Sequence, residues 1–302
     1  IWTYQYPADG KSRRSTECDW YDITFNCLDL VSTFGVFMSR FMSTQLTLKL
    51  ASFVLLWVLA CQNIYAKTDP NNSDAFLKAI VIPKVQPTSN PTRVLFVGNS
   101  FSFYNNGIHN HLGSLIRSTG EWKRQQNRLR LSTLSGGHIN EHSANLGSLL
   151  KDPAQSWHAI VLQGHSNEPI SVKKNKQFVL ATADVVQQIK AKGIQPILFM
   201  TWGYKGQPTM GIDLANVYTK LANKLDVLVV PVGLAFARAE AVLSNIELFV
   251  PDVMGVDSEN KLTYRTAWKH ASEAVTYLAA CVFYATLHQH SPDAIVVTEK
   301  LH

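Results

Sequence analysis

The chain has 302 residues, of which 46% are hydrophobic, so it can bury a large core in one large domain or two small ones. Its formal net charge is +6, but the basic residues are scattered, and only Lys173, Lys174 and Lys176 form a tight cluster. Such a cluster is typical of a solvated helix start, so the charge pattern argues against a nucleic-acid-binding surface.

The N-terminal part contains segments that we expect to lie outside the folded domain. Residues 50–66 carry no charge, follow Lys49 and end in the small residue Ala66, which is the pattern of a secretory signal peptide. We therefore predict a signal peptide over residues 38–66, a polar linker over 67–91, and export to the periplasm or medium of a bacterium. Residues 1–37 begin with Ile rather than Met, and we expect them to have no role in the fold.

Two alternatives remain for the apolar segment. Val58-Leu-Ala-Cys61 resembles a bacterial lipobox, so lipidation at Cys61 would tether the protein to a membrane without a spanning helix. The apolar core is shorter than the about 20 residues that a membrane-spanning helix needs, and a buried core helix is the other alternative. After Cys61 only Cys281 follows, so we expect no disulfide in the mature chain.

Apolar runs and helical periodicity predict alternating strands and helices in a domain over residues 92–302. We expect strands at residues 93–98, 128–134, 157–163, 196–201 and 227–230, and helices at 105–118, 174–192, 212–224, 234–247 and 271–287. Strands of this kind form parallel sheets covered on both faces. The predicted fold class is therefore α/β, a three-layer α/β/α sandwich around a mostly parallel five-stranded sheet, with ligands bound beyond the carboxyl ends of the strands.

The first strand ends in Gly98-Asn99-Ser100, at the junction with a helix. A serine at such a junction is exposed at the sheet edge, where the amides of the following helix can face an oxyanion. A helix N-cap is the purely structural alternative for Ser100. The run differs from the Gly-x-Ser-x-Gly elbow of α/β-hydrolases, because Ser102 occupies the place of the second glycine.

Val-Leu-Phe-Val-Gly-Asn-Ser-Phe-Ser, residues 94–102, resembles the first block of the SGNH (GDSL-like) hydrolases, in a variant with Asn where Asp is typical. The run that begins at His270 resembles the last block, in which a catalytic His opens the final helix. Gly136-Gly137-His138 and residues 162–167 resemble the second and third blocks more weakly. The resemblance covers residues 92–290 and implies the flavodoxin-like SGNH hydrolase fold, a cofactor-free carboxylic ester hydrolase, and a serine nucleophile.

Carried over residue by residue, the resemblance implies that Ser100 attacks an ester carbonyl and that His270 takes its proton. The family usually has Asp three residues before the catalytic His, but this sequence has Ala267 there. The orienting carboxylate would then be Asp257, with Asp252 or a backbone carbonyl as alternatives. A Ser–His dyad without a carboxylate, or an inactive enzyme, is also consistent with Ala267.

The oxyanion hole implied by the family consists of three hydrogen-bond donors. They would be the amide of Ser100, the amide of Gly137 (or Gly136), and the side chain of Asn167. One extra residue precedes Asn167 relative to the family pattern, so Gln163 is an alternative donor. We further expect four polar residues at the strand tips to bind substrate: Asn99, His138, Gln163 and His165. The expected substrate is a small-molecule or glycan ester, with O-acetyl groups on a carbohydrate as the favoured case.

Two other functions compete with the esterase. His138-Ile-Asn-Glu141-His142 spells the H-x-x-E-H pattern of a zinc metallohydrolase, although the pattern is short and follows a glycine pair at a strand tip. The favoured expectation includes no metal, with these residues in a loop or short helix beside the substrate. The other alternative is a non-catalytic carbohydrate-binding domain of the same fold, in which aromatic residues stack on sugars: Trp202, Tyr204 and Trp268.

Overall fold

The computed structural model describes residues 83–85, 90–151, 156–243, 245–293 and 295. The predicted signal peptide over residues 38–66, including Cys61, lies outside these residues, as do the segment 1–37 and most of the predicted linker 67–91. In the part of the chain that is described, no helix is both long and apolar enough to cross a membrane.

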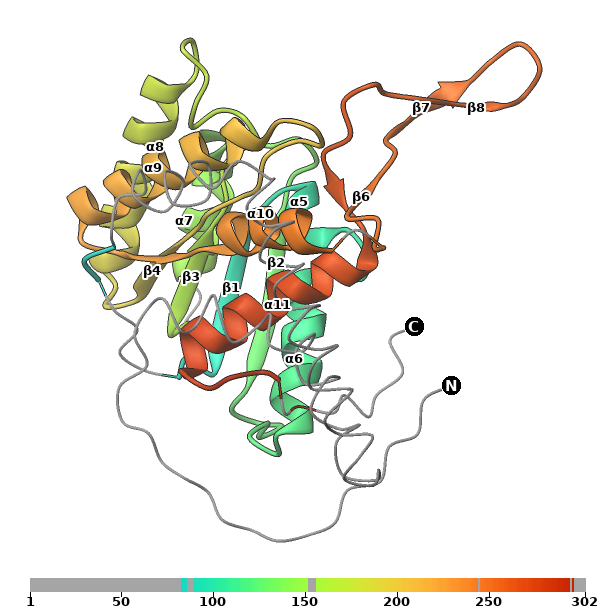
Figure 1. Cartoon of the computed structure of the whole chain (residues 1–302). Helices are drawn as coiled ribbons and strands as arrows, with labels where there is room; N and C mark the ends of the chain where they lie inside the picture. The colour runs from blue at the N-terminus through green and yellow to red at the C-terminus, as the bar shows by residue number, and fades with distance from the viewer. Residues whose placement is uncertain (1–82, 86–89, 152–155, 244, 294, 296–302) are drawn as a thin grey trace, which may run out of the picture.

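A parallel five-stranded sheet forms the centre of the domain (Figure 1). Its strands are β1 (Arg93–Gly98), β2 (Arg128–Thr133), β3 (Ala159–Leu162), β4 (Gln195–Phe199) and β5 (Leu228–Val230), in the order β2-β1-β3-β4-β5. Every neighbouring pair is parallel. The α/β prediction is thus confirmed, and each strand begins and ends within about two residues of its predicted bounds.

Helices cover both faces of this sheet. The first face carries α6 (Ile108–Ser118), α10 (Val232–Val242) and α11 (Glu273–His288), and the second carries α7 (Ser143–Lys151), α8 (Asn175–Lys190) and α9 (Pro208–Leu225). Successive residues of a strand point to opposite faces, so Phe96 joins the first hydrophobic cluster and Val97 joins the second. This two-sided burial explains why the strands are apolar throughout.

The sheet order also fixes where a ligand can bind. From β1 the chain crosses to β2 on one side, whereas β3, β4 and β5 follow on the other side. The loops after β1 and β3 therefore diverge, and such a switch point leaves a crevice at the carboxyl ends of the two strands. The residues that follow β1 and β3 include Ser100 and Gln163, respectively.

Two short helices lie among the sheet-edge loops. The helix expected over residues 105–118 begins only at Ile108, because Asn105, Asn106 and Gly107 have φ angles of 50°, 68° and 76°, which a right-handed helix cannot contain. A separate single turn, α5 (Ser100–Phe103), precedes this break. The 3₁₀ helix η2 (Ile139–His142) leads directly into α7.

The segment between α10 and α11 contains strands that the sequence does not predict. They are β6 (Phe249–Val250), β7 (Val253–Val256), β8 (Leu262–Tyr264) and β9 (His270–Ala271). The first pairs with the last, and the middle two form an antiparallel hairpin that projects from the body of the domain (Figure 1). The expected helix over 234–247 accordingly ends at Val242, and the one over 271–287 begins at Glu273.

Candidate active site

The turn after β1 holds Ser100 at the first position of α5. Asn99 is the N-cap of this helix, and its side-chain oxygen accepts the N–H of Phe101 at 3.2 Å. Gly98 must be glycine for a steric reason, because an added Cβ would lie 2.5 Å from Oε1 of Gln163 and 2.9 Å from Oγ of Ser102. The serine therefore begins the helix, and a neighbouring asparagine does the capping.

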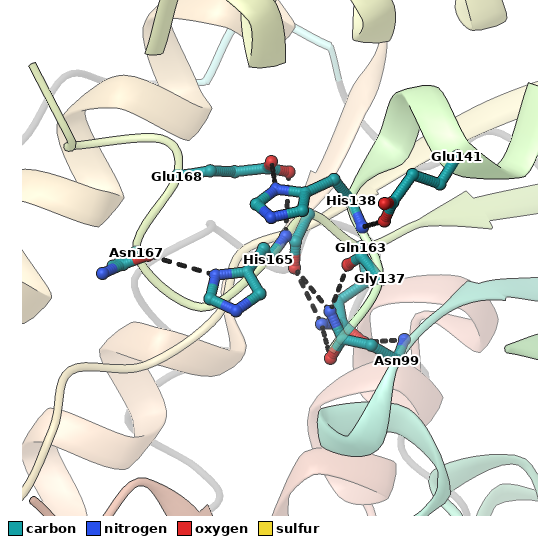
Figure 2. A network of polar contacts seen from close by, with 9 residues as sticks. Asn99, Gly137, His138, Glu141, Gln163, His165, Asn167 and Glu168 are labelled. Atoms are coloured by element: carbon teal, nitrogen blue, oxygen red, sulfur yellow. Dashed lines mark hydrogen bonds and ion pairs between the residues drawn. The ribbon is translucent and has the colours of Figure 1, made fainter. Parts of the chain in front are cut away.

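A buried polar network ties this turn to the tips of the neighbouring strands (Figure 2). Oε1 of Gln163 accepts the N–H of Asn99 at 3.1 Å and the hydroxyl of Ser102 at 2.7 Å. Its Nε2 donates to Oδ1 of Asn99 at 2.7 Å and to the carbonyl of Gly164 at 2.8 Å. Nδ2 of Asn99 donates to the carbonyls of Gly137 and Gly164, at 3.0 and 3.3 Å.

This network corrects the expected roles of Asn99 and Gln163. Their exposed fractions are 2% and 0%, and their side-chain amides are bonded to the protein itself. Neither side chain can bind substrate or an oxyanion without breaking these bonds, so we conclude that both fix the nucleophile turn. A polar residue at a strand tip looks the same in sequence whether it faces the crevice or the core.

Ser100 and His270 lie in hydrogen-bond contact. Oγ of Ser100 is 2.7 Å from Nε2 of His270, although 170 residues separate the two. His270 belongs to β9, where it pairs with Val250 of β6, and α11 begins three residues later at Glu273. The structure thus brings together the two residues for which the sequence predicts the roles of nucleophile and base.

The carboxylate beside His270 is Asp252, and the expectation for Asp257 is wrong. Oδ1 of Asp252 contacts Nδ1 of His270, and each residue is only 7% exposed. Asp257 instead lies in the exposed turn between β7 and β8, where its Oδ1 accepts the N–H groups of Glu259 and Lys261, both at 2.9 Å. The pairing of Val250 with His270 explains this choice, because it leaves Asp252 two residues from the histidine's partner.

Aromatic rings enclose the imidazole of His270. The ring of Tyr104 stacks on it with centroids 4.0 Å apart, and Phe101 meets it edge to face at 5.6 Å. Trp202 stacks on Phe101 and donates its indole N–H to the carbonyl of Lys269 at 2.8 Å. Burial among these rings lowers the pKa of His270, and Asp252 counteracts part of this shift. The imidazole is therefore held neutral, as a general base requires.

The three expected oxyanion donors differ in the hydrogen bonds that they already make. The N–H of Ser100 has no acceptor among the described residues. The N–H of Gly137 donates to the carbonyl of Leu134 at 2.9 Å, and Oδ1 of Asn167 lies 3.1 Å from Nδ1 of His165. The alternative Gly136 sits in an exposed turn with a φ of 66°. The amide of Gly137 is therefore already bonded within the protein, whereas the contact of Asn167 is made by its oxygen and leaves its Nδ2 donor without a partner among the described residues, so the oxyanion roles of Gly137 and Asn167 stay predictions.

A second histidine–carboxylate contact lies beside the network (Figure 2). Nδ1 of His138 contacts Oε2 of Glu168, whose side chain is only 4% exposed. Oε1 of the same carboxylate accepts the N–H of His165 at 2.8 Å. The rings of His138 and His165 stack with centroids 4.6 Å apart. The sequence predicts both histidines as substrate-binding residues. It does not predict Glu168, because only the folded loop brings this residue into contact with His138.

The geometry does not support the H-x-x-E-H interpretation. His138 is the extended N-cap of η2, and Glu141 accepts the N–H of His138 at 2.6 Å in a capping box. His142 is 2% exposed, and burial lowers its pKa. In a 3₁₀ helix residues four apart do not share a face, so the two histidines diverge. No group of three or more metal-ligating side chains occurs among the described residues.

The aromatic residues considered for sugar stacking make contacts within the protein itself. Trp202 is only 1% exposed and belongs to the core. The hydroxyl of Tyr204 lies 2.7 Å from that of Ser166, and Nζ of Lys205 lies 4.2 Å over the ring of Trp268. A separate cavity of about 350 Å³ between α6 and β2 has a polar lining that includes Arg117 and Arg124 but not Ser100 or His270.

Comparison with solved structures agrees with this architecture. A candidate SGNH hydrolase from Slackia heliotrinireducens is 21% identical, with a TM-score of 0.50 over 66% of this chain and 100% of that chain. The chain has the SGNH hydrolase fold. No protein-family model matches the sequence, and no curated protein matches it. At this identity the likeness to SGNH hydrolases concerns the fold, and a fold alone does not determine chemistry.

Two further solved structures give weaker likenesses. A DUF4886 family protein from Bacteroides uniformis is 17% identical, with a TM-score of 0.48 over 68% of this chain and 86% of that chain. A variant of an acetyl xylan esterase from Geobacillus stearothermophilus is 14% identical, with a TM-score of 0.44 over 72% of this chain and 100% of that chain.

Proposed function

We propose that this SGNH-fold protein is a serine hydrolase that cleaves carboxylic esters with Ser100, His270 and Asp252. The observation that carries the proposal is the unbroken chain of contacts from Oγ of Ser100 to Nε2 of His270, at 2.7 Å, and from its Nδ1 to Asp252. A serine, a base within hydrogen-bond reach and a third group that orients the base form the arrangement required for nucleophilic catalysis.

The proposed reaction has two halves. Oγ of Ser100 attacks the ester carbonyl carbon while Nε2 of His270 takes the hydroxyl proton, and the C–O bond to the alcohol then breaks as His270 protonates the leaving oxygen. Water attacks the resulting acyl-serine in the second half, again with His270 as base, and releases the acid. Asp252 accepts the Nδ1–H of His270 throughout, which fixes the tautomer and stabilises the imidazolium.

Stabilisation of the tetrahedral intermediate begins with the amide of Ser100. Its N–H lies at the start of α5 and has no acceptor among the described residues, so it can donate to the developing oxyanion. The amide of Gly137 would contribute only after exchanging its bond with Leu134 for the oxyanion. We propose this exchange as part of substrate binding, because catalytic hydrogen bonds often tighten only in the substrate complex.

The compartment and substrate remain proposals that rest on the sequence. The uncharged run over residues 50–66, with Ala66 at its end, supports export by a signal peptide, and Cys61 supports a lipid anchor as the alternative. A small acyl group on a carbohydrate, acetyl above all, fits an exported esterase of this fold. We expect mass spectrometry of the protein secreted by a bacterial host to show a new N-terminus either after Ala66 or at a lipidated Cys61.

The esterase proposal is tested by comparing hydrolysis of p-nitrophenyl acetate by the purified protein and by Ser100→Ala. We expect the variant to lose three or more orders of magnitude in kcat, since loss of a serine-protease nucleophile costs about 10⁶-fold. The control is Ser258→Ala, which changes an exposed serine in the hairpin turn and should keep full activity. Ser102→Ala is not used as the control because the hydroxyl of Ser102 bonds to Gln163. Equal, near-background rates for the protein and Ser100→Ala would favour a binding domain instead.

A further inference from the structure

Beside the nucleophile turn lie two histidines that the proposed triad does not use, His138 and His165 (Figure 2). Their rings stack with centroids 4.6 Å apart and an angle of 18° between the planes. Each follows a glycine whose carbonyl accepts a hydrogen bond from Nδ2 of Asn99, at 3.0 and 3.3 Å. Asn99 directly precedes Ser100, so the loops that carry the stacked pair are bonded to the nucleophile turn.

The contacts at Nδ1 determine the tautomer of both rings. Nδ1 of His138 contacts the carboxylate of Glu168, and a carboxylate only accepts hydrogen bonds. Nδ1 of His165 lies 3.1 Å from Oδ1 of Asn167, and an amide oxygen likewise only accepts. In its neutral form each ring therefore carries its proton on Nδ1, which leaves Nε2 as a hydrogen-bond acceptor.

Both Nε2 atoms are open to a ligand. Neither has a hydrogen-bond partner among the described residues, and neither belongs to the buried polar atoms there that lack partners, so both reach solvent. The side chain of His138 is 26% exposed, whereas its partner Glu168 is 4% exposed. A buried carboxylate bonded to Nδ1 fixes the tautomer and the orientation of a histidine ring.

His165 stays neutral because its surroundings disfavour a positive charge. Burial above all, together with the neighbouring His138, Lys174 and Lys269, lowers the pKa of His165 to about 4. Lys269 precedes His270 in sequence and also lowers the pKa of that residue, so the same charge acts on both rings. A lone pair on Nε2 of His165 is therefore available at neutral pH.

We propose that Nε2 of His138 and Nε2 of His165 accept hydrogen bonds from two neighbouring hydroxyl groups on the alcohol part of the substrate, so that the enzyme selects partly acylated polyols. This inference rests on the proposed esterase function and specifies its substrate. Two acceptors held side by side are complementary to two hydroxyl donors on adjacent carbons. Paired imidazoles can also bind a metal ion, but no group of three or more side chains that could hold one occurs among the described residues.

The test compares two acetate esters of glycerol, one with two neighbouring free hydroxyls and one in which both hydroxyls are masked. One is glycerol monoacetate, and the other is the same ester with its two free hydroxyls joined as an isopropylidene ketal. We expect the purified protein to prefer the free diol by at least about tenfold in kcat/KM, since a site built to bond a hydroxyl rejects the analogue that lacks it. The variants His138→Phe and His165→Phe keep the stacked ring but remove its nitrogens.

Each variant should lower the preference by about three- to tenfold, the value of one net hydrogen bond. His138→Phe also removes the partner of the buried Glu168 carboxylate, so His165→Phe, whose partner Asn167 is only half-buried, keeps the test valid if the first variant does not fold. The matched control is His158→Phe, which should leave the preference unchanged. His158 is exposed and precedes β3, whereas His165 follows the other end of that strand.

Three results would overturn the inference, and they can be told apart. If the protein hydrolyses p-nitrophenyl acetate through Ser100 but treats both glycerol esters alike, the polyol inference fails and the esterase proposal stands. If it prefers the diol and neither His138→Phe nor His165→Phe changes the preference, the histidines are not the selective groups. If no ester is hydrolysed in a Ser100-dependent way, the proposed function itself fails.

Discussion

The proposed triad joins two regions that are held together very differently. Ser100 follows a central strand, and the turn around it is fixed by Gln163 and Asn99, whose side chains make seven hydrogen bonds. His270 and Asp252 come from residues 249–271. In this segment β6 and β9 pair over only two residues each, and the hairpin between them projects from the domain (Figure 1).

A few specific contacts compensate for the short ladder in the second region. The indole N–H of Trp202 bonds to the carbonyl of Lys269, and Nδ2 of Asn105 bonds to the carbonyl of Ala271, both at 2.8 Å. These bonds hold the main chain in place on either side of His270, and the ring of Tyr104 stacks on the His270 imidazole. The difference teaches that changes in the first region should affect stability and activity together, whereas changes in the second should affect activity first.

The largest effect is expected from His270→Ala, which removes the base from the second region. We expect kcat for p-nitrophenyl acetate to fall by up to about 10⁶-fold, as for a serine protease without its histidine. The double variant with Ser100→Ala should be no slower than either single variant, because residues that act as a unit are not additive. Additive losses would show that the two residues act independently.

Within the second region, comparing kcat of Asp252→Asn with kcat of Asp257→Asn identifies the carboxylate that orients His270. Asparagine at 252 presents the wrong hydrogen-bonding group to Nδ1 of His270, and the corresponding change in a serine protease lowers kcat by about 10⁴-fold. Asp257 lies in the exposed hairpin turn, so its variant should retain nearly full kcat. Steady-state kinetics on p-nitrophenyl acetate measures kcat of both variants. A larger loss of kcat for Asp257→Asn than for Asp252→Asn would contradict the assignment of Asp252.

Gln163→Leu tests the first region, where stability and activity should fall together. The change leaves the N–H of Asn99 and the hydroxyl of Ser102 buried without their acceptor, and each such group costs about 1–3 kcal/mol. Equilibrium urea unfolding should therefore show at least about 2 kcal/mol of lost stability. Gln187→Leu, at an exposed position of α8, should stay within about 0.5 kcal/mol. Equal stabilities for the two variants would mean that the network is dispensable.

The smallest effect concerns the pH dependence of kcat/KM. Burial lowers the pKa of His270 from its ordinary value of 6.5, and only the neutral imidazole can accept the proton of Ser100. Activity on p-nitrophenyl acetate should thus be lost as the pH falls through a midpoint below 6.5. A midpoint above 6.5 would mean that Asp252 outweighs burial. The exposed His158 provides the control, because His158→Phe should not move the midpoint.

The sequence predicts the first region better than the second for physical reasons. Long apolar runs with helical or strand periodicity identify β1 to β5 and the major helices, and the Gly98-Asn99-Ser100 turn stands out at a strand end. Asp252 could not be distinguished from Asp257, because β6 and β9 are two residues each and carry no periodic signal. Asn99 and Gln163 were expected to face substrate, since a local pattern does not tell a buried amide from an exposed one.

The most direct test of the central claim is covalent labelling with a fluorophosphonate, which reacts with an activated serine by losing fluoride as the Ser Oγ–P bond forms. Intact-mass and peptide analysis of the purified protein should find a single adduct, located on Ser100, and none on Ser100→Ala. Labelling should also become much slower in His270→Ala, because the serine then lacks its base. An unlabelled protein, or an adduct on another residue, would contradict the assignment of Ser100 as the nucleophile.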